Sequence, residues 1–312
     1  MTKRWVGLNC LFVILYVPVA ELGMWLAVEP GNVTPLYPAA GIAFAAFLIL
    51  GKKVLPGIFF GGMLANMVSM PLSDMFYQSL SAALMIGMGE ALSVVAAGWI
   101  FHRFAHETSC LQKPKETVTL FLICFFWLIS PSIGVTALSL TGIISMGDFG
   151  FLWLTWWLGD ALGIILVVPV VLAAWGFFHD RLINPIAKPI RINILALYIS
   201  LIFAIALGGL PIVYLVIAAT LLWVTKHYYA GALISSLVPY IVLIPLSILG
   251  IGFYGEIAPP YSFIYLQVLL AVNSFIAFYL SAILYEYNIQ TRHVELVTEE
   301  ADFDPLTKVL NR

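Results

Sequence analysis

The chain has 312 residues, of which 62% are hydrophobic and only 10% are charged. A soluble globular domain carries about 25% charged residues, so this composition excludes a soluble protein and indicates a membrane protein. The formal net charge is −2, and we expect no nucleic-acid partner. No His/Cys cluster has the spacing of a metal site, so we expect neither a metal ion nor a cofactor in this chain.

Apolar segments of membrane-spanning length recur along the whole sequence. We count about ten; two of them are short, and an arrangement of eight spans with re-entrant segments remains open. In chain order they are 5–28, 38–50, 54–70, 78–101, 117–144, 149–178, 192–210, 211–224, 229–250 and 262–285. The predicted fold is therefore all-α, a polytopic integral membrane bundle of eight to ten spans.

The charged residues predict the orientation of these segments. If the N-terminus is inside, all 14 Lys and Arg residues fall on the inner side. The outer loops then carry only acids, namely Glu29, Asp74, Asp148 and Glu256. The positive-inside rule therefore predicts that both termini are cytoplasmic. The outer loops are short, so any stimulus must be read within the membrane or at its outer rim.

One stretch, 153–169, is organised around the acid Asp160. Gly159 and Gly163 are four residues apart, so a second backbone can approach the helix beside this acid. Trp157 lies one turn before Asp160, and we expect it to line a pocket, where its π-face suits a cationic or ring-bearing ligand. Two further tryptophans share this face, at positions 153 and 156.

Three acids lie within predicted spans: Asp160 and Glu90 near the midplane, and Glu21 in the outer half. No Lys or Arg lies in a span, so these acids must be protonated, hydrogen-bonded to neutral groups, sharing a proton, or holding a cation or a basic ligand. We predict a ligand- or proton-sensing role for Asp160 and Glu90, whereas helix packing explains Glu21 better. Asn66 is expected either to hydrogen-bond an acid or to join two helices.

The last span continues into a helical segment, 286–301, that contains neither Gly nor Pro. Its a and d heptad positions predict a parallel coiled coil, and hence a homodimer, with a solvated amphipathic tail as the alternative. The predicted signalling positions are Tyr287, Gln290, Val294 and Val297.

The final residues, Asp304-Pro-Leu-Thr-Lys-Val-Leu-Asn-Arg312, resemble the opening of a GGDEF diguanylate cyclase domain, with Lys308 where Gly is usual. The resemblance implies that residues 302–312 are the start of such a domain. The remainder of that domain would bind GTP and magnesium and make cyclic di-GMP. We therefore expect no enzymatic activity from these 312 residues, while the intact protein would be a diguanylate cyclase.

The membrane part, 1–285, resembles a membrane-associated sensor domain of the first MASE type. The resemblance rests on Leu36–Ala43, Leu50–Ile58 and Asn66, and on Trp157–Gly163 with Pro169. It implies a multi-pass input module in a bacterial inner membrane, responding to an unknown small molecule or to protons. Two rival functions remain open: a secondary transporter that uses the buried acids, and a ligand-free anchor that only dimerises the chain.

Overall fold

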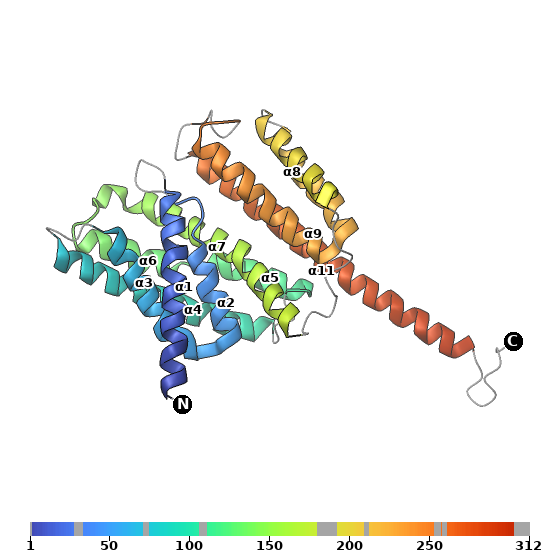
Figure 1. Cartoon of the computed structure of the whole chain (residues 1–312), viewed down its shortest axis with the longest axis horizontal. Helices are drawn as coiled ribbons and strands as arrows, with labels where there is room; N and C mark the ends of the chain where they lie inside the picture. Colours follow the sequence, from blue (N-terminus) through green and yellow to red (C-terminus); the bar gives the residue numbers. More distant parts are fainter. Residues whose placement is uncertain are drawn as a thin grey trace.

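The computed structural model describes residues 2–27, 34–70, 75–105, 111–179, 192–208, 212–252, 257 and 261–302. All regular elements in these ranges are helices, which confirms the all-α prediction, and they form a bundle from which the end of α11 projects (Figure 1). The elements are α1 (Thr2–Trp25), α2 (Pro38–Leu50), η1 (Gly51–Val54), α3 (Leu55–Ser69), α4 (Phe76–Phe104), α5 (Pro114–Phe126), α6 (Ile129–Leu140), η2 (Met146–Asp148), α7 (Phe149–Phe178), α8 (Ile192–Leu207), η3 (Ile212–Tyr214), α9 (Leu215–Ile248) and α11 (Tyr261–Asp302).

Membrane-spanning length is found in seven helical stretches of the described chain, and α8 contains a shorter apolar helix. The prediction of a membrane-spanning helical bundle is thus confirmed, whereas this criterion does not confirm about ten spans. Two of the three missing spans arise where one stretch contains a break that separates two predicted segments, within Pro38–Ser69 and within Ile212–Ile248, and the third is α8, which is too short for this criterion.

The sharpest break lies within α9, at Tyr228, whose φ of 51° and ψ of −128° are not helical. A side chain at Gly231 would lie 3.0 Å from the carbonyl oxygen of Trp223. Residues eight apart in a straight helix are about 12 Å apart along its axis. The chain therefore folds back on itself at Tyr228, close to the boundary that the sequence predicted between two segments.

The stretch Pro38–Ser69 is interrupted by η1, where Gly51 adopts a φ of 65°. The two helices that it joins pack on different neighbours, because α2 lies on α7 while α3 lies between α1 and α4. The stretch Pro114–Leu140 is interrupted at Trp127, between α5 and α6.

Helix α7 is the most buried of the spanning stretches. Its glycines permit the close approach of α2 that the sequence predicted. A side chain at Gly163 would collide with the backbone oxygen of Tyr37, and one at Gly41 would collide with the backbone oxygen of Gly163. The amide of Tyr37 donates to the carbonyl of Gly159 at 3.0 Å, which ties the start of α2 to α7.

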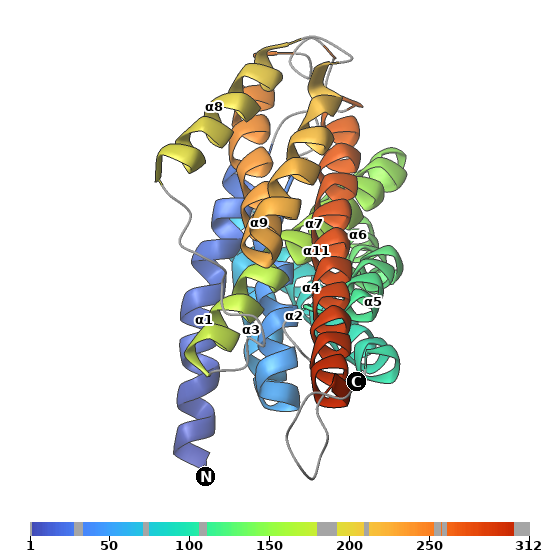
Figure 2. The same cartoon turned by 90° about the vertical axis from the view of Figure 1, so that its right-hand side faces the viewer.

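The last element, α11, is one unbroken helix of 42 residues that packs mainly against α9 and also touches α5 and α7. One face of this helix is buried as far as Tyr285, and the side chains beyond that residue are mostly exposed. The start of α1 and the end of α11 lie toward the same end of the bundle (Figure 2).

Candidate functional site

Two buried acids from different helices meet at one serine in the centre of the N-terminal half. Glu90 lies on α4, Asp160 on α7 and Ser130 on α6, and their exposed fractions are 1%, 0% and 2%. The hydroxyl of Ser130 lies 3.0 Å from Oδ2 of Asp160 and 3.3 Å from Oε1 of Glu90. This acid pair, Glu90 and Asp160 with Ser130 between them, therefore joins three helices through one hydroxyl group.

The geometry limits the protonation of the acid pair. A hydroxyl has one hydrogen, so Ser130 can donate to only one of the two carboxyl groups. It accepts from the other only if that carboxyl carries a proton. Oδ1 of Asp160 and Oε2 of Glu90 have no hydrogen-bond partner among the described residues, basic side chains included. The arrangement therefore suits a pair of acids that holds at least one proton, or a cation in its place.

Aromatic side chains with polar atoms surround the acid pair. Tyr16 and Tyr37 lie within electrostatic range of both acids, and the indole of Trp127 lies beside Asp160. The buried hydroxyl of Tyr16 lies near Tyr37 and the buried indole N–H of Trp127 lies near Asp160, although neither donor reaches full hydrogen-bond geometry within the described part of the chain. These donors are placed to respond to the charge of the acids, because a buried donor without a partner costs about 1–3 kcal/mol.

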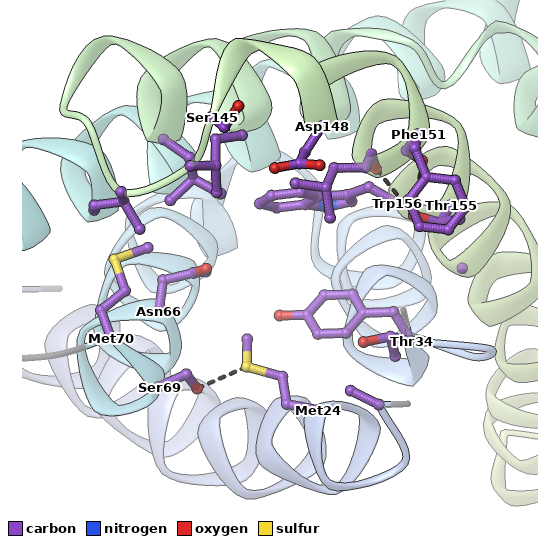
Figure 3. A pocket seen from close by; sticks show the side chains of 17 residues that line it. Met24, Thr34, Asn66, Ser69, Met70, Ser145, Asp148, Phe151, Thr155 and Trp156 are labelled. Atoms are coloured by element: carbon purple, nitrogen blue, oxygen red, sulfur yellow. Dashed lines mark hydrogen bonds between the residues drawn. The ribbon is translucent and has the colours of Figure 1, made fainter. Parts of the chain in front are cut away.

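A cavity of about 700 Å³ adjoins the acid pair at the end of the bundle opposite the start of α1. Thr34 and Tyr37 form one side of it, and the other sides come from the ends of α1, α3 and α6 and the start of α7. Side chains from several of these elements are directed into the same space (Figure 3). The volume falls in the range of about 300–1,000 Å³ that is typical of small-molecule sites.

The cavity and the acid pair share two residues as neighbours. Gly159 lines the cavity directly before Asp160, and Tyr37 lines it while facing both acids. Because Gly159 and Tyr37 are also joined by a backbone hydrogen bond of 3.0 Å, displacement of either one alters the surroundings of Asp160.

Trp157 does not line this cavity, contrary to our expectation; Trp156 does. The indole N–H of Trp157 donates to the carbonyl of Cys124 at 3.0 Å, which holds the ring against α5. Trp156 instead packs on Gly134, where a side chain would lie 2.9 Å from its ring. The indole of Trp153 donates to Ser132 at 3.0 Å.

Asn66 and Glu21 lie near the cavity rather than at the acid pair. Asn66 lines the cavity, and its amide donates to the carbonyl of Gly62 at 2.9 Å; no hydrogen bond from Asn66 to an acid is found among the described residues. Glu21 accepts a hydrogen bond of 3.2 Å from Ser69, which joins α1 to α3. This contact agrees with the packing role expected for Glu21.

A contact to α11 was not predicted. The side-chain amide of Gln267 donates to the carbonyl of Pro35 at 3.0 Å, and Gln267 is only 1% exposed. Pro35 lies between Thr34 and Tyr37, the two residues that line one side of the cavity. The segment 34–37 is therefore held between α7 and the helix that leaves the bundle.

The sequence pattern could not single out Ser130 or Gln267. Serine occurs often in membrane helices as a helix contact, so Ser130 is not distinguishable from the other serines. Gln267 offered a weak signal, because a long amide inside an apolar span needs a partner.

Comparison with known proteins gives one match. The family model MASE1 matches residues 8–288, which includes the acid pair, the cavity and Gln267. Neither the curated proteins nor the solved structures contain a match to the chain.

Proposed function

We propose that this chain, which belongs to the MASE1 family of membrane-associated sensory domains, is the input part of a signalling protein that controls cyclic di-GMP synthesis. MASE1 domains usually occur in signalling proteins, and the chain is embedded in a membrane through its apolar helices. The cyclase output is supported by the sequence resemblance of residues 304–312, which lie outside the described residues.

The observation that carries the proposal is the hydrogen bond between Gln267 and Pro35. It connects the wall of the cavity to α11, the helix that continues beyond the bundle. A ligand or proton that moves segment 34–37 therefore acts directly on α11. The part of α11 beyond Tyr285 contains neither Gly nor Pro, the residues at which helices usually kink. The helix therefore transmits such a movement to the next domain as a rigid rod.

In this proposal the acid pair and the cavity together form the sensor. Binding or protonation changes the charge held at Glu90 and Asp160, and hence the packing of α4, α6 and α7 around Ser130. Glu21 joins α1 to α3 at the edge of the cavity, and Asn66 lines the cavity from α3. Trp157 fixes α7 against α5 through the carbonyl of Cys124.

We place the protein in the bacterial inner membrane with about ten crossings and both termini in the cytoplasm. Counting α2 and α3 separately, counting the two halves of α9 separately, and adding α8 raise the number of crossings from seven to ten. The ends of α1 and α11 toward the same side (Figure 2) and the inner positions of Lys and Arg support this orientation.

We also propose that the protein dimerises through the projecting part of α11. The side chains of Tyr287, Val294 and Val297 are 65%, 63% and 50% exposed, although two of them are aliphatic. Together with Gln290 they follow the a and d positions of a parallel coiled coil. A second copy of the chain would cover this stripe and bring two output domains together.

The test joins residues 1–302 to a diguanylate cyclase domain and measures cyclic di-GMP in cells and in membranes. We expect Asp160→Asn and Glu90→Gln to change the output and Gln267→Met to make it insensitive to those changes. Val268→Met is the matched control, because Val268 is the next residue on α11 and is 51% exposed. Normal output from well-folded Asp160 and Glu90 variants would instead favour a ligand-free anchor. Proton uptake by proteoliposomes would favour a transporter.

A further inference from the structure

The described residues that line the cavity beside the acid pair include an acid and no basic side chain. Asp148, at its rim, is the one charged side chain among the described residues that line it. All 14 Lys and Arg residues and all five His residues lie outside the sequence stretches that form this end of the bundle. An anionic ligand would therefore enter without a counter-charge, which is unfavourable in a partly desolvated site.

The remaining lining is aromatic, thioether and apolar. Tyr37 lines the cavity with its ring. Trp156 also presents its ring to the cavity, and Met24 and Met70 present flexible side chains from other elements (Figure 3). Aromatic faces attract cations, and methionine adapts to apolar bodies of different shape. Asp148 is exposed at the rim while Tyr37 is only 7% exposed in the interior, so the site has a charged mouth and an apolar interior.

We infer that this cavity binds a small organic amine, with its ammonium group at Asp148 and its apolar or ring-bearing body between Trp156 and the methionines. The inference rests on the proposed sensory function and specifies the chemical class of the stimulus. Such a ligand touches α3, α7 and the segment that leads into α2 at once, so its binding changes the relative positions of the helices that enclose it.

A protonated amine reaches this site from either of two sources. It is a free amine from the outer aqueous phase, or it is the headgroup of phosphatidylethanolamine in the outer leaflet. The ammonium chemistry is the same in both cases, and in the proposed orientation the cavity opens toward the outer membrane surface, where both are present.

The experiment measures binding to the purified full chain in nanodiscs that contain only phosphatidylglycerol. Three probes of similar shape are titrated: 2-phenylethylamine, 2-phenylethanol and phenylacetate. We expect the amine to bind about five- to ten-fold more tightly than the alcohol, and phenylacetate not to bind. Asp148→Asn should remove the preference for the amine, Asp148→Glu should retain it, and Trp156→Ala should weaken both the amine and the alcohol.

Glu286→Gln is the control for charge, because Glu286 is an exposed acid on the projecting part of α11; it should leave binding unchanged. Nanodiscs with phosphatidylethanolamine separate the sources: weaker amine binding identifies the lipid headgroup as the occupant, and unchanged binding identifies a free amine. Undetectable binding of the amine overturns the inference, as does phenylacetate that binds equally well or amine binding that is unaffected by Asp148→Asn.

The readout is binding, so it is independent of any output domain. Amine binding without an effect on cyclic di-GMP would contradict the proposed function and leave the ligand assignment standing. A cyclase response that depends on Asp160 without amine binding would support the proposed function and contradict the ligand assignment.

Discussion

The contact at Ser130 makes a quantitative prediction about folding stability. Ser130→Ala removes the hydroxyl that bridges Asp160 and Glu90 at 3.0 and 3.3 Å. Each buried polar group that loses its partner costs about 1–3 kcal/mol, so two groups give about 2–4 kcal/mol if the acids partly compensate. Domains of 150–250 residues lose about 2–4 °C in Tm per kcal/mol, and we expect a decrease of at least about 4 °C.

The matched control is Ser93→Ala on α4. Ser93 is 3% exposed, like Ser130, but its hydroxyl makes no hydrogen bond within the described residues. Its replacement should be neutral or slightly stabilising. The assay is thermal unfolding of both variants in the same lipid nanodiscs, followed by tryptophan fluorescence. Equal Tm values for the two variants, with both stabilities within about 0.5 kcal/mol of wild type, would refute the bridging role of Ser130. A cycle with Asp160→Asn should show coupling of about 0.5–3 kcal/mol, because the residues are in contact.

Four further predictions concern a backbone contact, the topology and α11. Gly163→Ala should destabilise the protein by about 1–3 kcal/mol in the same unfolding assay, because its methyl group meets the backbone of α2; Gly7→Ala, in open space, should not. Compartment reporters after Arg312 and at Gly255 should report cytoplasm and periplasm respectively, and a periplasmic C-terminus would contradict the proposed output. Insertions beyond Gln290 should change cyclase output with helical period, since one residue rotates the helix by about 100° and seven leave about 20°. Gln290→Leu should bias the output toward one state, whereas a smooth decline with insertion length would indicate a flexible tether.

The parts of the fold that depend on composition and on local residue spacing were predictable from the sequence. The apolar segments predicted a helical membrane bundle, and the boundary near Tyr228 was visible as a short charged interval around Lys226. The close approach at Gly159 and Gly163 was also predictable, because a Gly-x-x-x-Gly pair has few other uses in a membrane helix.

The choice among neighbouring side chains was not predictable. Trp156 and Trp157 are about 100° apart on the helix, and the positions of Gly134 and the Cys124 carbonyl decide which ring meets the cavity. Asn66 bonds to the carbonyl of Gly62 on its own helix. The sequence prediction considered only partners on other helices and therefore missed this contact. Such contacts depend on where other helices lie, which local spacing does not specify.

The unbroken form of α11 makes it a lever with a fixed ratio of arms. If it pivots near Tyr285, where burial ends, Gln267 lies about 27 Å to one side at 1.5 Å per residue. The end of the helix at Asp302 lies about 25 Å to the other side. Because the arms are nearly equal, a displacement of 1 Å at the cavity wall would reappear as about 1 Å at the tip, in the opposite direction. In a dimer, if the Gln267 regions of the two α11 helices moved apart, the two helix ends at Asp302 would therefore move together by about the same distance.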